Sequence, residues 1–266
     1  IALYTDLACV RQAETVVISI GSQGLQGLMD QLKPLSLRDR IFVLCMKGLE
    51  QGTGRRLSQI AEENLDPSNA VAVWLGPGHV QEFYRGIPNC MVIDSRREDV
   101  KRRLVQSFSS DLIRFYYGDD LIGNEVGAAA KNVVGIAAGF LDGKGLSSLK
   151  GALMSRGTRE VARLIQAMGG SQLSAYGLCH LGDYEATVFS RYSHNRQFGE
   201  SFIRGETYTD LAEGYYTVEA LVLLGQRYGV ELPICQAVHR VLYCGADPMQ
   251  ELRALLDRNL TREFGE

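Results

Sequence analysis

The sequence predicts an α/β protein in which a largely parallel sheet with covering helices is followed by an all-helical part. Up to about residue 118, short apolar runs rich in β-branched residues alternate with segments of helical apolar spacing. This alternation is typical of repeated βα units. From about residue 119 the strand pattern disappears, and helical segments alone follow. These two observations divide the chain into residues 1–118 and residues 119–266.

The predicted strands of the first part are short and continuously apolar, as is typical of parallel strands buried on both faces. The first strand is TVVISI at residues 15–20, and the helical spacing of GLQGLMDQLKPL follows it. Three more strand and helix pairs follow in order: RIFVLCMKG (40–48) with GTGRRLSQIAEENL, AVAVWLGPG (70–78) with HVQEFYRG, and CMVIDS (90–95) with REDVKRRLVQSFSS.

The second part opens with a long helical segment of small residues, DDLIGNEVGAAAKNVVGIAAGFLDG. An amphipathic helix follows in LKGALMSRGTREVARLIQAMGG, and its glycine pair, Gly169 and Gly170, marks its end. Further helices are predicted at 209–228 and 233–244, where Pro233 suits the first turn of the last one. Between the amphipathic helix and the helix at 209–228, residues 180–200 form a polar, turn-prone stretch.

The composition is that of a globular protein, with 266 residues, 45% hydrophobic and 22% charged residues. A net charge of -3 does not point to nucleic acid. We interpret the six scattered cysteines as reduced core residues of a cytoplasmic protein. No apolar run reaches the roughly 18 residues that a membrane span needs. The sequence leaves the oligomeric state open, a homodimer included.

Lys131 is the first candidate for chemistry, because lysine occurs at only six positions and this one lies in an apolar helix. Its neighbours three and four positions away are glycine, alanine and valine, which form a packing face. A lysine on such a face reaches solvent or stays buried. Burial favours the neutral amine and suits it to acid–base catalysis. Asn132 beside it is expected to orient that amine or a substrate oxygen.

Two further candidates follow predicted strands directly. Lys47 comes after the strand FVLCM and precedes Gly48, and in open α/β sheets ligands bind beyond the carboxyl ends of the strands. The alternative for Lys47 is a solvated loop lysine. GPGH at 76–79 lies at the equivalent end of the next strand, where we expect a turn rather than a ligand contact.

The polar stretch 180–200 concentrates hydrogen-bonding side chains. Donors such as Ser, Asn and Arg at this density suit an anion such as phosphate, and a solvated loop with Arg196 on the surface is the alternative. His180 and His239 are interpreted as structural, and no metal-ligand spacing is present. The polar side chains of this stretch are Asp183, Thr187, Ser193, His194, Asn195 and Arg196.

In this arrangement the chain resembles the NAD(P)-dependent glycerol-3-phosphate dehydrogenases. The resemblance rests on an ordered set of segments, above all the lysine–asparagine helix followed by the LGD and S-x-N-R segments. It implies a Rossmann-like cofactor domain followed by a helical substrate domain, with the active site in the cleft between them. The segments are DLACVRQAETVVISIGSQ, KGLEQGTG, LGPGHVQEFYRGIP, DDLIGNEVGAAAKNVVGIAAGFLDG, GALMSRGTREVARL, LGDYEATVFSRYSHNRQFG, AEGYYTVEAL and RYGVELPICQAVHRVLY.

The resemblance also implies a reaction, its cofactor and its site residues. The reaction is reversible hydride transfer between NAD or NADP and dihydroxyacetone phosphate, giving sn-glycerol 3-phosphate for the glycerophospholipid backbone. Lys131 is the implied proton donor, Lys47 the second active-site lysine, which lowers the pKa of Lys131, and Asp183 the third catalytic residue. The implied substrate-binding residues are Lys47, Gly76, Gly78, Lys131, Asn132, Asp183, Thr187, Ser193, His194 and Asn195. The implied cofactor-binding residues are Ser22, Lys47, Val80, His194, Leu211 and Glu213.

The chain also departs from the family pattern. His194 stands where relatives usually have arginine, Gly78 replaces a usual Ser, Thr or Asn, and Val80 replaces an alanine. The family's first strand and its glycine-rich turn, which bind the pyrophosphate, have no counterpart here. We therefore expect the sequence to be a piece of a longer protein. A catalytically lapsed relative that binds or senses a small phosphorylated metabolite is the alternative function.

Overall fold

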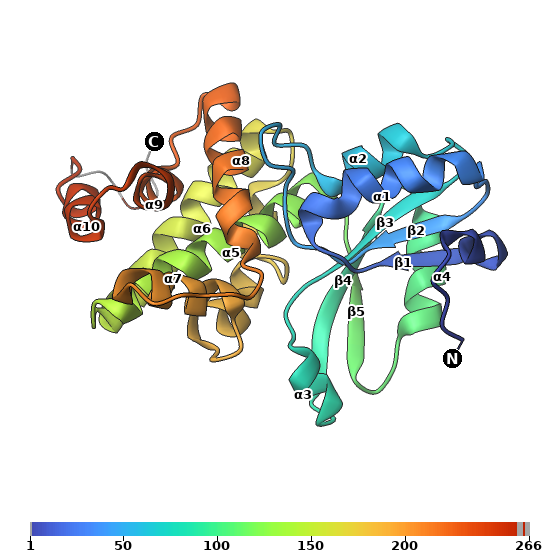
Figure 1. Ribbon diagram of the computed structural model, residues 1–266, viewed down its shortest axis with the longest axis horizontal. Helices are drawn as coiled ribbons and strands as arrows, with labels where there is room; N and C mark the ends of the chain where they lie inside the picture. The colour runs from blue at the N-terminus through green and yellow to red at the C-terminus, as the bar shows by residue number, and fades with distance from the viewer. Residues whose placement is uncertain (1, 260–262, 264–266) are drawn as a thin grey trace.

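The computed structural model describes residues 2–259 and 263, and its first half is a five-stranded sheet with helices on both faces (Figure 1). The strands lie side by side in chain order. Parallel pairs join β1 to β2, β2 to β3 and β4 to β5, while β4 is antiparallel to β3. The strands are β1 (Thr15–Ile18), β2 (Ile41–Leu44), β3 (Ala70–Leu75), β4 (Asn89–Ser95) and β5 (Ile113–Tyr117).

The antiparallel pair corrects the expected succession of βα units. The helix between β3 and β4 is α3 (Val80–Tyr84), a five-residue helix that lies beyond the end of the sheet (Figure 1). A parallel connection needs a crossover that packs back along the sheet face, usually through a full helix. Because α3 does not cover the sheet, the chain returns from the same end and β4 runs backwards. The strand β5 was not predicted.

Alternating side chains of the central strands feed two cores, as expected of strands buried on both faces. Phe42 and Leu44 of β2 pack on one face with α1 (Leu25–Leu32) and α2 (Leu57–Asn64). Ile41 and Val43 point to the other face, where they pack with α4 (Glu98–Phe108). This two-residue period confirms the buried strand pattern.

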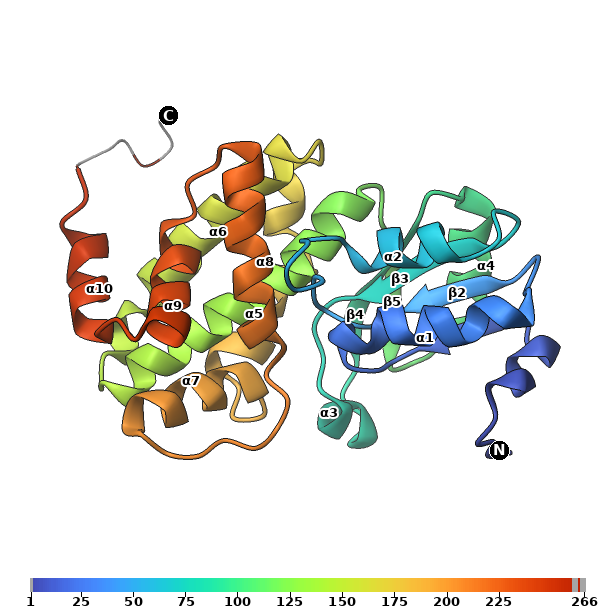
Figure 2. The same ribbon diagram turned by 45° about the horizontal axis from the view of Figure 1, so that its top comes forward.

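The second half is a helical bundle built around α5 (Leu121–Gly143). Figure 2 shows α5 running from the bundle towards the sheet, so one helix serves both halves. The helix α7 lies inside the stretch that was expected to be a polar turn region, and α10 was not predicted. The other helices of the bundle are α6 (Lys150–Ala167), α7 (His194–Arg204), α8 (Glu213–Tyr228), α9 (Pro233–Cys244) and α10 (Pro248–Leu256).

Short helical turns complete the described chain. Two of them, Leu181–Asp183 and the π-helix Glu185–Phe189, lead into α7 and carry predicted site residues. The remaining turns are 3-10 helices at Leu7–Gln12, Ser22–Gly24, Lys33–Leu35, Ser147–Leu149 and Gln172–Tyr176.

Close contact with α7 explains why α5 contains so many small residues. A Cβ atom added to Gly139 would collide with the backbone of α7 at Arg196, and one added to Gly199 would collide with the α5 backbone at Ile136. The two helices therefore touch backbone to backbone. The apolar face that contains Lys131 is a close-packing surface, as its composition predicts.

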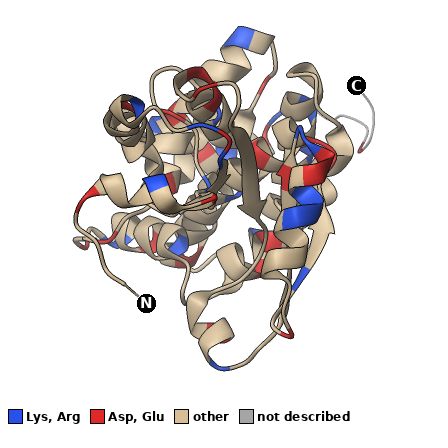
Figure 3. Cartoon of the chain, turned by 90° about the vertical axis from the view of Figure 1, so that its right-hand side faces the viewer, with Lys and Arg blue, Asp and Glu red and all other residues tan. Residues whose placement is uncertain are grey.

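Charged residues of both signs are mixed along the sheet half of the molecule. Figure 3 shows Lys and Arg interspersed with Asp and Glu over the sheet end of the molecule. In the part of the chain that the structure describes, no helix has both the length and the apolar character needed to cross a bilayer.

All six cysteines are free, but only Cys179 and Cys235 are buried and Cys244 is exposed, so the expectation of six core cysteines is wrong.

Candidate active site

Lys131 lies on α5 with its amine buried at the point where the bundle meets the sheet. Its Nζ donates a hydrogen bond to Thr187 Oγ1 at 2.7 Å and lies 3.1 Å from Asp183 Oδ2. Thr187 Oγ1 in turn donates to the Asp183 carbonyl oxygen at 2.7 Å. Because the hydroxyl proton is used in that bond, Thr187 presents a lone pair to the lysine. The amine is thereby held in one place.

Lys47 reaches the same carboxylate from the sheet. It follows β2, and its Nζ donates to Asp183 Oδ2 and to the carbonyl oxygen of Gly76, each at 2.6 Å. Gly76 lies just beyond β3, so the carboxyl ends of two neighbouring strands meet the helical half at this ammonium group. The position after the strand, which favoured a ligand-binding role for Lys47, places it as expected of open α/β sheets.

Asp183 joins the two lysines through one of its oxygens only. Oδ2 accepts from both amines, while Oδ1 is buried and has no hydrogen-bond partner. The side chain is 1% exposed. Buried polar atoms without partners are rare in native proteins. Oδ1 is therefore an acceptor that a bound molecule can satisfy.

The environment of Lys131 changes its acid strength. Burial, which disfavours the charged amine, lowers the pKa of Lys131 to about 8. The carboxylate of Asp183 opposes this shift, and the positive charge of Lys47 adds to it. The predicted influence of Lys47 is present, but burial is the larger cause. The amine can therefore exchange a proton near neutral pH.

Asn132 does not orient Lys131, which corrects one interpretation of the sequence. Its Nδ2 donates to the backbone carbonyl of Lys47 at 2.7 Å, and its Oδ1 accepts from Asn195 Nδ2 at 3.1 Å. Asn195 Oδ1 accepts from the backbone N–H of Gly214 at 2.8 Å. Consecutive residues on a helix point in different directions. Asn132 thus fixes the backbone of the other lysine.

The start of α7 carries the predicted anion-binding residues. Ser193 is buried and caps the helix by accepting from the backbone N–H of Arg196 at 3.3 Å. His194, the first helical residue, is exposed, and its Nδ1 lies 2.8 Å from the Tyr208 hydroxyl. The N-terminus of a helix attracts anions through its backbone N–H groups. His194 and Asn195 flank this N-terminus.

Arg196 is neither a surface residue nor a free anion donor, contrary to both interpretations of the sequence. Its guanidinium pairs with Asp142 at 2.9 Å and with Glu200 at 2.8 Å, and it donates to the carbonyl of Ser190 at 3.2 Å. Its side chain is 14% exposed. Arg196 therefore ties α7 to the end of α5.

Ser22 and Glu213, two residues predicted to bind cofactor, meet between the halves. Ser22 follows β1, and its backbone N–H donates to Glu213 Oε1 at 2.8 Å, while its hydroxyl donates to Oε2. Leu211 is largely exposed, and its side chain lies against Gly21. Val80 is exposed at the start of α3 and takes no part in the hydrogen bonds of the two lysines.

Gly76 and Gly78 both need glycine. Their φ angles are +124° and +142°, which side chains rarely adopt. A Cβ atom on Gly78 would also lie 2.6 Å from the ring of Phe83. The ring of Phe83 thus fills the space that a side chain at residue 78 would need.

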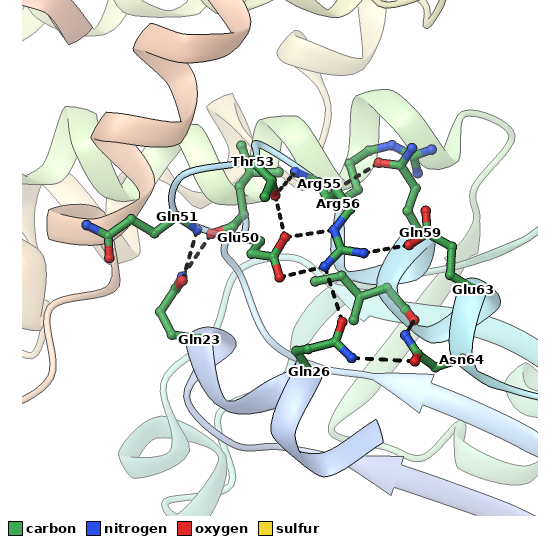
Figure 4. Close-up of polar contacts among 12 residues, drawn as sticks. Gln23, Gln26, Glu50, Gln51, Thr53, Arg55, Arg56, Gln59, Glu63 and Asn64 are labelled. Atoms are coloured by element: carbon green, nitrogen blue, oxygen red, sulfur yellow. Dashed lines mark hydrogen bonds and ion pairs between the residues drawn. The ribbon is translucent and has the colours of Figure 1, made fainter. Parts of the chain in front are cut away.

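The loop after Lys47 is ordered by a polar network that Figure 4 shows. Arg55 binds both oxygens of Glu50, at 2.7 and 2.8 Å, and also reaches Glu63 at 2.6 Å. Gln23 accepts from the backbone N–H of Gln51 at 2.9 Å. These contacts explain the polar sequence KGLEQGTGR. They hold the segment that starts with Lys47 against α1 and α2.

A buried ion pair fixes α5 to the sheet half. Glu125 lies 2.5 Å from Arg56 Nη1, and its other oxygen accepts from the backbone N–H of Ser58 at 2.8 Å, at the start of α2. A carboxylate suits the positive end of a helix dipole. Sequence reasoning missed Glu125, although it occupies the same small-residue helix that made Lys131 conspicuous.

His180 and His239, which were interpreted as structural residues, both contact other side chains of the protein. His180 is fully buried. Its Nδ1–H donates to the Gly127 carbonyl oxygen and its Nε2 accepts from the Tyr184 hydroxyl, each at 2.8 Å, and burial lowers the pKa of His180 to about 4. His239 stacks on Tyr243 at a centroid distance of 5.0 Å. Both make internal contacts. Among the described residues no cluster of three or more His, Cys, Asp or Glu side chains could hold a metal ion.

Comparison with known proteins places this site in a family. The pattern described as NAD-dependent glycerol-3-phosphate dehydrogenase C-terminus matches residues 120–253, and the N-terminus pattern of the same family matches residues 1–101. The chain belongs to the NAD-dependent glycerol-3-phosphate dehydrogenase family. The resemblance predicted from the ordered segments is thereby confirmed.

Individual relatives agree with the family assignment. A glycerol-3-phosphate dehydrogenase [NAD(P)+] of Chlorobium limicola is 34% identical over 272 residues, covering 98% of this chain and 82% of the relative. One from Thermus thermophilus is 39% identical over 258 residues, covering 94% and 78%. The crystal structure of the Coxiella burnetii glycerol-3-phosphate dehydrogenase superposes with a TM-score of 0.90 at 29% identity, covering 96% and 81%. The Rossmann-like fold with a helical second half is therefore that of the family.

Proposed function

We propose that this oxidoreductase transfers a hydride reversibly between NAD(P)H and C2 of dihydroxyacetone phosphate, giving sn-glycerol 3-phosphate, with Lys131 as the proton donor. The observation that carries the mechanism is the pairing of two lysines on one oxygen of Asp183, at 2.6 Å for Lys47 and 3.1 Å for Lys131. Structural lysines are rarely buried together without further carboxylates.

The residues account for the proton transfer. When the hydride reaches C2, negative charge develops on the carbonyl oxygen, and a buried ammonium stabilises that charge and delivers its proton. With a pKa of about 8, Lys131 is mostly protonated at pH 7 and yet gives up its proton readily. Lys47, held by Gly76 and Asp183, contributes a second positive charge. In the reverse direction the neutral amine accepts the proton of the C2 hydroxyl.

The residues present fit the nicotinamide end of the cofactor. Leu211 offers an exposed apolar side chain against Gly21, beside the Ser22–Glu213 hydrogen bonds that join the two halves. A flat ring with an amide suits an apolar wall next to polar groups. We propose that Ser22, Lys47, Leu211 and Glu213 hold this end and that the bound cofactor supplies the hydride. Roles for Val80 and His194 in cofactor binding stay predictions.

The phosphate is assigned to the start of α7. The helix N-terminus supplies backbone N–H groups and positive potential, and Ser193, His194 and Asn195 lie in its first turn. Binding energy from a phosphate far from C2 can be used to align the reacting carbon. A histidine in place of the family's arginine weakens the fixed positive charge, so a modest phosphate affinity is expected.

A steady-state assay tests the function. Purified protein is mixed with dihydroxyacetone phosphate and NADH or NADPH, and the loss of absorbance at the reduced nicotinamide is followed together with the formation of sn-glycerol 3-phosphate. The proposal expects turnover with at least one cofactor. Binding of the phosphorylated substrate without turnover would contradict it and would favour a metabolite-binding role.

The setting of the reaction belongs to the same proposal. The product is the backbone of glycerophospholipids, so the enzyme would supply their synthesis from the cytoplasm, as a homodimer. Six free cysteines support a reducing compartment. Lipid labelling in cells that lack the enzyme tests the role in glycerophospholipid synthesis. The mass of the protein in solution tests the homodimer.

A further inference from the structure

A large cleft lies in the helical half, beside the helices α9 and α10 that form the end of the molecule away from the sheet (Figure 1). It opens between α5, α6, α9 and α10, and we call it the α6–α10 cleft. Its volume is about 1380 Å³, whereas pockets for small molecules usually measure about 300–1,000 Å³. Because protein interiors are otherwise close-packed, a space of this size has room for a bound molecule.

The walls of the α6–α10 cleft carry apolar side chains from all four helices. Those of α10 recur three positions apart, so they share one face of that helix. None of the nine residues of α10, all of which the structure describes, is buried. The apolar face of α10 is therefore only partly covered. The apolar lining includes Phe140, Leu153, Val238, Met249, Leu252 and Leu255.

Arginines gather along the α6 side of the cleft. Arg156, Arg159 and Arg163 all line it and recur three and four positions apart, so they share one face of α6. Burial is the largest cause that lowers the pKa of Arg163. The positive charges of Arg159, Arg156 and Arg258 lower that pKa further, while Glu160 raises it. The four guanidinium groups thus lie close enough to repel one another.

The carboxylates that line the cleft leave this positive charge largely in place. Glu160 is buried, and its two oxygens accept from backbone N–H groups at the start of α9, at 2.8 and 2.9 Å. Glu251 pairs with Arg240 at 2.6 Å, and Glu231 pairs with Arg258 at 2.7 Å. The remaining two are exposed, where water weakens their attraction for the arginines. These two are Asp257 and Glu263.

An arginine cluster beside an apolar wall is complementary to an amphiphilic anion. A guanidinium group binds phosphate through two parallel hydrogen bonds, and several of them together suit a group with more than one negative charge. A phosphate monoester carries about -1.5 to -2 at pH 7, whereas a carboxylate carries -1. The apolar wall suits a hydrocarbon chain, because burial of apolar surface is favourable.

We propose that the α6–α10 cleft binds a single-chain amphiphile with a phosphate monoester head group, free in solution. The phosphate lies against Arg156, Arg159 and Arg163, and the chain lies along Leu153 and the apolar face of α10. None of the residues that line the cleft takes part in the site around Lys131, so the inference does not depend on the proposed function.

Calorimetric titration of the whole chain with dodecyl phosphate, below the concentration at which it forms micelles, tests the proposal. Dodecanoate has a chain of the same length with a carboxylate head, and inorganic phosphate has no chain. The proposal expects dodecyl phosphate to bind at least about tenfold more tightly than either. It expects Arg156→Gln with Arg163→Gln to weaken dodecyl phosphate by about tenfold or more. Leu252→Asp should weaken dodecyl phosphate and dodecanoate alike.

Matched controls separate loss of the site from damage to the fold. Arg253→Gln removes an exposed arginine of α10 that does not line the cleft, so it should keep wild-type affinity. Arg163 also donates to the carbonyl oxygen of Glu231 at 3.0 Å, so Arg156→Gln alone, on an exposed residue, is measured as a second variant and should weaken binding in the same direction. Circular dichroism confirms that each variant is folded.

Three results would overturn the proposal. The first is wild-type protein that does not bind dodecyl phosphate, or binds it no more tightly than dodecanoate. The second is unchanged affinity in both the double arginine variant and Leu252→Asp, which would place the ligand elsewhere. The third is binding to vesicles that contain an anionic phospholipid without binding to dodecyl phosphate, because the face would then dock on a membrane surface.

Discussion

At the scale of single residues, the proposed chemistry depends on one carboxylate shared by two amines. Asp183 Oδ2 accepts from Lys47 at 2.6 Å and lies 3.1 Å from Lys131, and Thr187 completes the cage around the buried lysine. Removal of one partner would leave the others buried without compensation, which is costly. The two lysines and the carboxylate therefore act as a unit, and their substitutions should not be additive.

The first residue-scale prediction concerns Lys131→Met, which keeps the length and the apolar stem but removes the ionisable amine. Loss of a general acid typically reduces the rate by a factor of about 10²–10⁴. We expect kcat for ketone reduction to fall by that amount while the fold, followed by circular dichroism, is retained. The exposed Lys144→Met serves as the control and should keep wild-type kcat. A Lys131→Met variant with full kcat would remove this residue from the mechanism.

Sequence reasoning located these residues unevenly. Lys131 was conspicuous because a charge on a packing face conflicts with its surroundings, and Lys47 because it follows a buried strand. The unpartnered Oδ1 of Asp183 was not predictable, because an unsatisfied buried atom is visible only in three dimensions. Of the two roles predicted for Asn132, orientation of Lys131 was wrong, since the direction of its side chain depends on which element packs there.

At the scale of elements, α5 decides how the two lysines meet. Its Glu125 pairs with Arg56 at 2.5 Å and caps the start of α2, and its Asn132 holds the backbone of Lys47 at 2.7 Å. Its glycines bring α7 into backbone contact. One helix thus sets the distances from Lys131 to both halves of the site.

The ion pair at the start of α2 gives an element-scale prediction. Glu125→Ala leaves the Arg56 guanidinium buried without its partner, so the free energy of unfolding should fall by about 3–5 kcal/mol. Urea denaturation measures it. Glu231→Ala, which breaks the exposed pair with Arg258, should cost less than about 1 kcal/mol. Equal effects of the two substitutions would show that the buried pair does not hold α5.

The packing of α5 on α7 gives a second element-scale prediction. Gly139→Ala places a methyl group against the α7 backbone, and such overpacking costs about 1–3 kcal/mol. Gly151→Ala on α6 meets nothing within 4 Å and should be neutral or stabilising by up to about 1 kcal/mol. Thermal melting of both variants checks this. The melting temperature should fall for Gly139→Ala and stay or rise for Gly151→Ala. A Gly139→Ala variant as stable as the wild type would contradict the close helix contact.

The elements themselves were predictable to the extent that their patterns were local. The strands of β1 to β4 and the helices α5, α6 and α9 follow from apolar spacing and from stop signals such as Gly169. The direction of β4 did not, because it depends on where the short α3 lies relative to the sheet. The helix α7 was hidden by its polar residues, several of which face α5 or the site.

At the scale of the whole molecule, the site exists only where the two halves join. Lys47 and Gly76 come from the sheet half, and Lys131, Asp183 and Thr187 from the helical half. Burial at this junction is what lowers the pKa of Lys131 to about 8. No single segment of sequence contains both lysines and Asp183, so spacing alone could not establish the proposed site.

The pH dependence of kcat/KM in both reaction directions tests this account most directly. Ketone reduction needs the ammonium form of Lys131, so it should fall as pH rises through about 8. Oxidation of glycerol 3-phosphate needs the neutral amine, so it should fall as pH drops through the same value. Mirror-image profiles that cross near pH 8, after correction for the proton in the overall reaction, are the predicted result. Profiles without a titration between pH 7 and 9 in either direction would contradict a buried lysine as the proton donor.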